Sequence, residues 1–126
     1  MRYANEGKEK LPVKATPARA VHILGAGPIG CAFAAAFHDA GAEVVLVDPQ
    51  ETARRAAHER IESNLRAIRT AGLDFGGAGA LSVSETTDAR LVDAALVIEC
   101  GPERLEAKRA IFADLIERSG AETVLA

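Results

Sequence analysis

Three glycines near the start of the chain have a spacing that is typical of anion-binding loops. Gly25, Gly27 and Gly30 follow the pattern G-x-G-x-x-G, between an apolar run at residues 20–24 and an alanine-rich stretch with helical character. A helix that begins in such a loop presents unpaired backbone N–H groups and the positive end of its dipole, which favour a pyrophosphate. We predict that a dinucleotide binds through the residues of this segment, Gly25, Ala26, Gly27, Pro28, Ile29 and Gly30.

Each small residue of this loop has a separate physical reason. Gly25 permits the tight turn, Gly27 lets the backbone approach the pyrophosphate, and Gly30 lets the helix pack closely on the strands. Pro28 lacks an N–H group, but it presets the first helical turn, where proline is tolerated. The same spacing also occurs in glycine-rich turns without a ligand. The strand before the loop and the helix after it favour the cofactor interpretation.

An acidic residue follows the next apolar run at the distance that a dinucleotide site requires. Asp48 closes the run at residues 43–48 and lies 18 positions after Gly30. Its carboxylate would accept hydrogen bonds from the adenosine ribose and repel a 2′-phosphate, which favours NAD over NADP. Arg54 and Arg55 lie one helical turn further on and keep NADP as an alternative. Asp48 could also cap the helix that is expected from Glu51.

A second polar cluster, VIECGPERLEAK, follows the fourth apolar run. We expect this strand to end at Glu99 and a helix to begin near Pro102 or Glu103. Ligands of doubly wound sheets bind outside the carboxyl ends of the strands, so this loop would face the same crevice as the glycine loop. Glu103 and Lys108 are candidate cofactor contacts there. The alternative is an acid in a first helical turn and a solvated lysine.

The order of apolar and helical patterns predicts the fold that positions these residues. Apolar runs alternate with helical stretches, as in βαβ units with a parallel sheet, and the runs 21–24, 44–47 and 95–98 are continuous enough to be central strands. Residues 51–70 carry one apolar stripe and predict a helix, and the glycine-rich segment after it predicts a loop. We expect a single Rossmann-type α/β domain at residues 19–126, with strand order 3-2-1-4-5 and the crevice between the first and fourth strands. Residues 1–18 are predicted to be a flexible lead-in.

Composition narrows the class of partners. The net charge of −3 and the interleaving of arginines with acids argue against nucleic acid, and no apolar run is long enough to span a bilayer. Cys31 and Cys100 have neither a metal-ligand spacing nor a disulfide framework, so no metal is expected and a cytoplasmic location is favoured. Cys31 is expected to be a small buried packing residue.

Residues 20–126 resemble the NAD-binding domain of the 3-hydroxyacyl-CoA dehydrogenases and their relatives. The similarity lies in the order GAGPIG, EVVLVD, a long helix ending near Gly72, TTDARLVDAALVIE, GPERLEAKRAIFADL and ETVLA. The resemblance implies that the residues from Gly25 to Gly30 and Asp48 hold the ADP part of NAD. It also implies that Glu103 and Lys108 contact the dinucleotide.

The resemblance further implies a mechanism in which a histidine removes the 3-hydroxyl proton while a hydride passes to NAD. It places that histidine, its partner glutamate and a helical second domain after Ala126, outside this chain. His22 is expected inside the first strand, and His38 and His58 on helices, so no catalytic residue is assigned here. The chain alone is expected to be inactive.

The family also suggests a substrate and an assembly. Its members that use acyl-CoA bind the CoA partly through polar and lysine positions on the long helix, where this chain has Asn64 and Ala71. The stretch CGPERLEAK is similar to the carnitine and gulonate dehydrogenase branch, whose substrates are free 3-hydroxy acids. The substrate is therefore a 3-hydroxyacyl-CoA or a free 3-hydroxy acid, and the full-length enzyme is expected to be a homodimer. A non-catalytic dinucleotide-sensing module is the alternative.

Overall fold

Strands and helices alternate along the chain. The computed structural model describes residues 20–87, 91–101 and 103–126, so the proposed lead-in at residues 1–18 lies outside the described residues. The elements in chain order are β1 (Ala20–Leu24), α1 (Pro28–Asp39), β2 (Glu43–Val47), α2 (Glu51–Thr70), β3 (Leu81–Ser84), the short 3₁₀ helix η1 (Leu91–Asp93), β4 (Ala94–Glu99), α3 (Leu105–Arg118) and β5 (Val124–Leu125).

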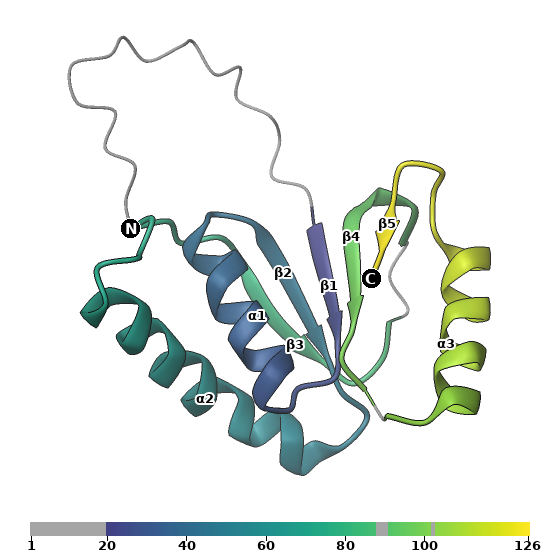
Figure 1. Ribbon diagram of the computed structural model, residues 1–126, viewed down its shortest axis with the longest axis horizontal. Helices are drawn as coiled ribbons and strands as arrows, with labels where there is room; N and C mark the ends of the chain where they lie inside the picture. The colour runs from purple at the N-terminus through teal and green to yellow at the C-terminus, as the bar shows by residue number, and fades with distance from the viewer. Residues whose placement is uncertain (1–19, 88–90, 102) are drawn as a thin grey trace, which may run out of the picture.

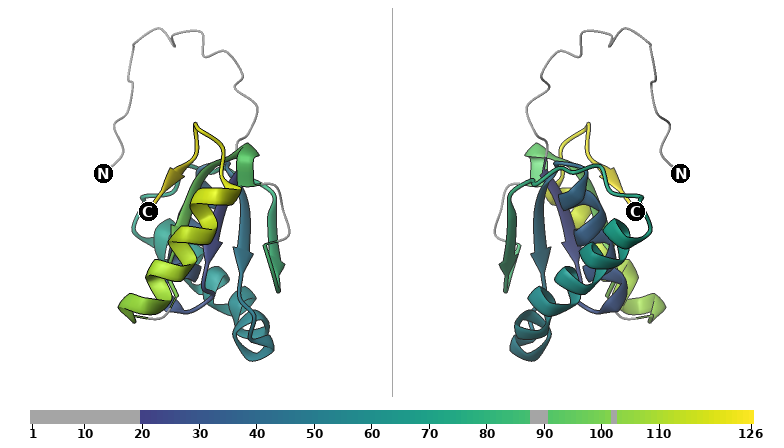
Figure 2. Two further views of the ribbon diagram at one scale, coloured as in Figure 1. Left: turned by 90° about the vertical axis from the view of Figure 1, so that its right-hand side faces the viewer. Right: turned by 90° about the vertical axis from the view of Figure 1, so that its left-hand side faces the viewer.

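The strands form one parallel sheet in the order β3-β2-β1-β4-β5. This order confirms the predicted doubly wound fold. Helices α1 and α2 cover one face of the sheet and α3 covers the other (Figures 1 and 2). No helix in the described ranges is both long and apolar enough to cross a membrane.

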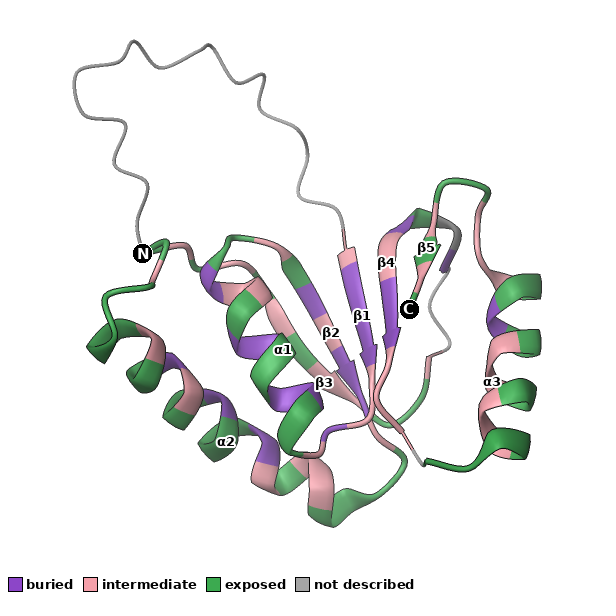
Figure 3. Cartoon of the chain, in the orientation of Figure 1, coloured by how far each residue is buried: buried purple, intermediate pink, exposed green. Residues whose placement is uncertain are grey.

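Two apolar cores hold the layers together, because successive side chains of a strand point to opposite faces. On one face, Ile23 of β1 packs in a core that includes the predicted stripe of α2, with Ala57, Ile61 and Leu65 buried and Ile68 partly buried against them. On the other face, Leu24 packs against the core that contains Leu115 of α3. Figure 3 shows the buried side of α1 and α2 turned toward the strands. The sheet is thus covered on both faces, as its continuous apolar runs predicted.

The register of the central strands brings the carboxyl ends of β1, β2 and β4 level. Leu24 pairs with Val47 on one side and with Glu99 on the other. The loops that follow these three strands therefore start next to one another, at Gly25, Asp48 and Cys100. Two backbone bonds fix this edge, from the Gly25 N–H to the Val47 carbonyl and from the Cys100 N–H to the Leu24 carbonyl, both 2.7 Å.

One predicted boundary needs correction. The third long helix begins at Leu105, whereas the sequence suggested a start near Pro102 or Glu103. Arg104 adopts extended backbone angles (φ −120°, ψ 123°) and is the N-cap, so Glu103 lies before the helix. Pro102 falls outside the described residues. The predicted loop at residues 72–80 is confirmed, with the backbone of Gly72 and Gly76 in the left-handed region.

A buried histidine in β1 gives the first testable prediction. His22 is 3% exposed and its Nδ1 has no hydrogen-bond partner among the described residues. Burial, aided by the charge of Arg118 and opposed by that of Glu43, lowers the pKa of His22 below its ordinary value. Below about pH 6.5 the unfolded chain then binds more protons than the folded one. The free energy of unfolding should therefore fall as the pH drops through this range, down to the folded-state pKa.

Replacing His22 with valine removes this titration from a strand that tolerates a β-branched side chain. Urea denaturation at pH 7.5 and pH 5.5 should show a smaller loss of stability for His22→Val than for the unmodified protein. His58→Gln is the matched control, because His58 is exposed on α2. Equal pH dependence in His22→Val and the unmodified protein would rule out His22 as the source.

Candidate functional site

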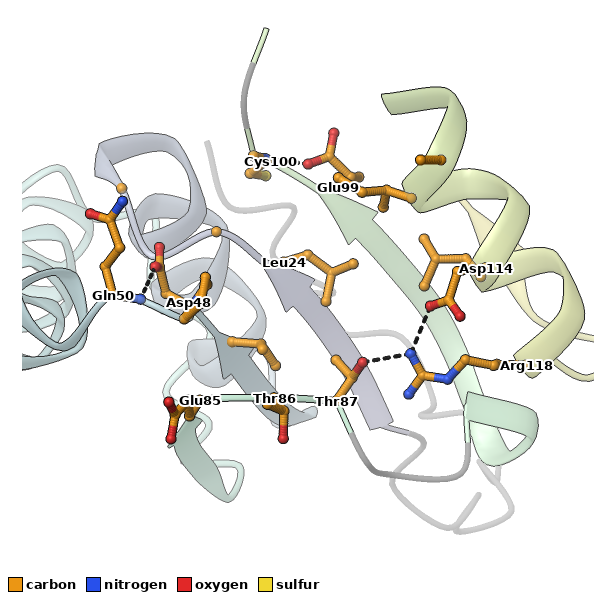
Figure 4. A pocket seen from close by; sticks show the side chains of 18 residues that line it. Leu24, Asp48, Gln50, Glu85, Thr86, Thr87, Glu99, Cys100, Asp114 and Arg118 are labelled. Carbon is orange, nitrogen blue, oxygen red and sulfur yellow. Dashed lines mark hydrogen bonds and ion pairs between the residues drawn. The ribbon is translucent and has the colours of Figure 1, made fainter. Parts of the chain in front are cut away.

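A cavity of about 720 Å³ lies at the carboxyl ends of β1, β2 and β4. Its walls come from the glycine loop, from the residues after β2 and β3, from the end of β4 and from one side of α3. Figure 4 shows Leu24 on its floor, with Asp48 and Gln50 on one side and Asp114 and Arg118 on the other. The predicted crevice between the first and fourth strands is therefore present.

The three glycines of the loop have three different surroundings. Gly25 has a φ of +109°, and a Cβ there would lie 2.8 Å from the Cys100 carbonyl oxygen. A Cβ on Gly30 would collide with the Gly25 carbonyl group, because the helix packs directly on the turn. A Cβ on Gly27 would meet no atom within 4 Å, and Gly27 lines the cavity. The structure therefore gives Gly25 and Gly30 packing roles and leaves open space at Gly27.

The helix that follows the loop begins without a side-chain cap. Gly27 is the N-cap of α1, Pro28 occupies the first turn, and no side chain bonds to the first amide groups. Ile29 is 67% exposed beside it. A helix N-terminus in this condition offers backbone donors and a positive partial charge to an anion. The open space at Gly27 leaves room for a pyrophosphate to reach these donors.

Ala26 is buried, and its peptide group is held by side chains from three elements. The Ala26 N–H donates to Asp48 Oδ2 at 2.9 Å. The Ala26 carbonyl accepts from Arg60 Nη1 of α2 at 3.1 Å and from the Cys31 thiol of α1 at 3.4 Å. Cys31 is fully buried, as expected for a packing residue. These bonds fix the backbone of the loop before any ligand is present.

Asp48 sits at the end of β2, on the wall of the cavity. Its Oδ1 accepts the Gln50 N–H at 2.9 Å, and its Oδ2 accepts the Ala26 N–H. It is not the N-cap of α2, as the sequence had left possible; Gln50 occupies that position. A carboxylate oxygen can accept more than one hydrogen bond, so Asp48 can brace the loop and still accept ribose hydroxyl groups.

The two arginines that left NADP as an alternative cofactor already have hydrogen-bond or ion-pair partners within the protein. Arg54 Nη1 donates to the carbonyl groups of Asp48 and Pro49, both at 2.9 Å. Arg55 pairs with Glu51 at 2.8 Å on the exposed surface of α2. The guanidinium groups therefore stabilise the turn after β2 and the first turn of α2, whereas Asp48 lines the cavity.

Glu103 and Lys108 of the second cluster lie near each other, but Lys108 lies closer to another acid, Glu99. Lys108 Nζ lies 2.6 Å from Glu99 Oε2 and 3.8 Å from Glu103 Oε1. The Glu99 side chain is 1% exposed, whereas that of Glu103 is 91% exposed. Hydrogen bonding to Glu99 raises the pKa of Lys108, and the charges of both acids add to this effect. The ammonium group therefore stays protonated beside the Glu99 carboxylate at the end of β4.

Sequence reasoning missed Glu99 as a site residue, although a signal was present. Glu99 ends an apolar strand at the edge of the sheet, which is the position that singled out Asp48. It also missed the far wall of the cavity, where Arg118 Nη1 bonds to Thr87 Oγ1 at 2.8 Å and to Asp114 Oδ2 at 2.9 Å. Thr87 and Arg118 are distant in sequence, and no local pattern joins them.

The cysteine in the cavity wall has surroundings that disfavour thiol chemistry. Burial raises the pKa of the Cys100 thiol, and the Glu99 charge raises it further, which disfavours the reactive thiolate. Within residues 20–87, 91–101 and 103–126, no three side chains of His, Cys, Asp or Glu gather as a metal site.

Comparison with known proteins agrees with this geometry. Residues 20–126 match the family model described as the NAD-binding domain of 3-hydroxyacyl-CoA dehydrogenase. An L-carnitine dehydrogenase of Streptomyces griseus is 34% identical over 109 residues, which are 86% of this chain and 32% of that protein. A 3-hydroxyacyl-CoA dehydrogenase of Gibberella moniliformis is 32% identical over 108 residues, 86% of this chain and 34% of that protein. The chain thus spans about a third of the length of these relatives.

A solved structure shows the same similarity in three dimensions. The 3-hydroxybutyryl-CoA dehydrogenase of Escherichia coli superposes with a TM-score of 0.70 and is 30% identical. The match covers 87% of this chain and 24% of that one.

Proposed function

Because this chain belongs to the 3-hydroxyacyl-CoA dehydrogenase family and forms its NAD-binding domain, we propose that it is the cofactor part of an enzyme that oxidises a 3-hydroxyl group. The observation that carries the proposal is the open space at Gly27, in front of an uncapped helix N-terminus and beside Asp48. NAD supplies the hydride acceptor when it is bound. The residues assigned to it are Gly25, Ala26, Gly27, Pro28, Ile29, Gly30, Asp48, Glu103 and Lys108.

Each part of the site has a distinct task in this proposal. The backbone from Gly25 to Gly30 takes the pyrophosphate at the N-terminus of α1. Asp48 accepts the ribose hydroxyl groups, and Lys108 and Glu103 contact the dinucleotide from the start of α3 and the loop before it. These tasks need no movement of the loop, because Asp48 and Arg60 already hold the Ala26 peptide group.

Helix α2 favours a free 3-hydroxy acid over an acyl-CoA as the substrate. The side-chain amide of Asn64 donates to the Arg60 carbonyl of its own helix at 2.8 Å, and Ala71 carries no polar group. The resemblance implies polar and lysine residues at these positions in CoA-binding relatives; Ala71 supplies neither, and the Asn64 amide nitrogen is already bonded to its own helix. Both an L-carnitine dehydrogenase and a 3-hydroxyacyl-CoA dehydrogenase occur among the relatives, so a panel of substrates for the full-length enzyme decides between the two classes.

We further propose a cytoplasmic homodimer without a nucleic-acid or membrane partner. The two free thiols, Cys31 and Cys100, suit a reducing compartment, and the net charge of −3 disfavours a polyanion. The homodimer rests on the family resemblance alone.

Calorimetric titration of NAD⁺ and NADP⁺ tests the cofactor assignment. The unmodified protein should bind NAD⁺ more tightly, and Asp48→Ala should weaken NAD⁺ binding by about tenfold or more, since a hydrogen bond to a charged group contributes about 1.5–3 kcal/mol. Binding of NADP⁺ should fall less, because the repulsion of its 2′-phosphate is relieved, so the preference narrows.

Asp48→Asn is the matched control for the loop. It keeps one side-chain oxygen for a backbone amide but has no charge, so the preference should narrow with less disturbance of Ala26. Tighter binding of NADP⁺ by the unmodified protein would contradict the assignment. An absence of any dinucleotide binding would contradict the proposed function itself.

A further inference from the structure

A carboxylate is buried in the wall of the crevice, where a phosphate-bearing ligand would repel it. Glu99 is the last residue of β4, and its side chain is 1% exposed. Burying an ionised carboxylate is costly unless it is paired and hydrogen-bonded. Both oxygens of Glu99 have partners: Oε1 accepts the Gly101 N–H, and Oε2 accepts from Lys108 Nζ at 2.6 Å. With its side chain 1% exposed and both oxygens bonded to protein donors, Glu99 offers a ligand little surface for a direct contact.

Lys108 is the cation that pairs with this carboxylate. It lies in the first turn of α3, with its side chain 28% exposed. A lysine side chain has four rotatable methylene groups and ordinarily loses considerable rotamer freedom when it is fixed. Here the buried carboxylate holds the ammonium group in one place, and the exposed Glu103 adds a weaker contact at 3.8 Å.

The same carboxylate shapes the loop between β4 and α3. Gly101 packs so closely on Glu99 that an added Cβ would collide with Oε1. One residue earlier, the Cys100 carbonyl group lies against Gly25, the first glycine of the phosphate loop. Glu99 thus connects Lys108, the Gly101 backbone and the turn at Gly25 in one cluster.

We propose that Glu99, which lines the cavity, is a positioning residue of the dinucleotide site and acts on the ligand by holding the Lys108 ammonium group beside the end of β4. This inference rests on the proposed function, in which Lys108 contacts the dinucleotide. A positioning role differs from a purely structural one in a measurable way. If Glu99 acts by positioning Lys108, its replacement affects ligand binding only while Lys108 is present.

Lysine labelling tests the first half of the inference without any ligand. Acetic anhydride modifies unprotonated, accessible amines. Peptide mass spectrometry compares the labelling rate of Lys108 with those of Lys8, Lys10 and Lys14 of the same chain. Glu99→Gln should raise the labelling rate of Lys108 several-fold relative to the other lysines, because the ammonium group loses its partner. Glu106→Gln, an exposed acid in the same helical turn, should leave the rate unchanged. An unchanged rate in Glu99→Gln would overturn the inference.

A double-mutant cycle tests the second half with NADH as the ligand. Glu99→Gln and Lys108→Met should each weaken binding by about tenfold, and the double variant should also lose about tenfold rather than about a hundredfold. Losses that multiply would show that Glu99 acts independently of Lys108 and would overturn the inference. Glu106→Gln should bind like the unmodified protein.

Two further outcomes are distinguishable. If Lys108→Met binds NADH normally while Gly27→Val does not, the positioning role fails and the proposed function stands. If the unmodified protein binds no dinucleotide, the proposed function fails first.

Should Glu99→Gln not fold, Glu99→Asp keeps the charge but withdraws the carboxylate by one methylene group. Faster Lys108 labelling and weaker NADH binding in folded Glu99→Asp support the inference, and normal values of both overturn it.

Discussion

Replacing Gly27 with valine is expected to lower dinucleotide affinity by about a hundredfold or more while the protein still folds. The backbone at Gly27 has a φ of −76° and a ψ of −171°, which a valine adopts without strain. A Cβ at this position meets no protein atom within 4 Å. The cost to stability is that of a poorer N-cap residue, about 1 kcal/mol. The branched side chain instead fills the space in front of the first amide groups of α1.

The size of the effect follows from the bonds that the side chain would block. A hydrogen bond to a charged group contributes about 1.5–3 kcal/mol, so losing two weakens binding by about 3–6 kcal/mol. Each 1.4 kcal/mol changes the dissociation constant about tenfold, which gives a factor of about a hundred or more. Calorimetry with NAD⁺ and NADH measures the affinity, and circular dichroism with thermal unfolding measures the fold.

Gly30→Ala is the matched control, because Gly30 lies in the same loop but is closely packed, whereas Gly27 borders open space. Its Cβ would collide with the Gly25 carbonyl group, so this variant should lose stability rather than affinity alone. Gly27→Ala should lie between the unmodified protein and Gly27→Val in affinity. If Gly27→Val keeps both a native circular dichroism spectrum and native affinity, the glycine loop is not the phosphate site.

The sequence was sufficient to predict the fold because the deciding signals are local. The continuous apolar runs marked the central strands, and the stripe through Ala57, Ile61 and Leu65 marked the 20 residues of α2. The strand order then followed from the general rules for alternating strands and helices. Gly30 was likewise predictable, since it packs against Gly25 within the same loop, whereas the neighbour of Gly25 is Cys100, which follows a strand distant in sequence.

The contacts that complete the site were not predictable, because they join distant elements. Arg60 reaches the Ala26 carbonyl across 34 positions, and Arg118 reaches Thr87 across 31. Arginine on a helix surface gives no sign of which carbonyl or hydroxyl group it will meet. The start of α3 was misjudged for a related reason, since the extended backbone at Arg104 and the Gly101 bond to Glu99 depend on how the loop packs.

The chain by itself is expected to bind NAD(H) without oxidising a 3-hydroxy substrate. None of its three histidines lies in the described crevice wall. His22 is buried in β1, His38 Nδ1 contacts the Gly79 carbonyl oxygen at 2.6 Å, and His58 is exposed on α2. A positioned general base contributes a factor of about 10² to 10⁴ in rate, and orientation of the substrate contributes more.

Three of the four acids that line the described crevice already have protein partners. Asp48 accepts two backbone amides, Glu99 pairs with Lys108, and Asp114 pairs with Arg118. In each of these carboxylates at least one oxygen is bonded to a protein donor, which competes with a substrate hydroxyl group for that oxygen. We therefore expect the groups at this edge of the sheet to bind the cofactor and not to remove the substrate proton.

The test mixes the purified 126-residue chain with NAD⁺ and a panel of 3-hydroxyacyl-CoA thioesters, carnitine and free 3-hydroxy acids. Absorbance of NADH reports turnover, and calorimetry on the same sample reports cofactor binding. Binding without NADH formation is the expected result, because the glycine loop and Asp48 lie within one sheet whose two cores are both present. NADH formation that scales with the amount of pure chain would contradict it, and would place the base among the groups of this domain. His22→Val, His38→Gln and His58→Gln would then show whether a histidine is the base, since the variant that has lost the base would also lose turnover.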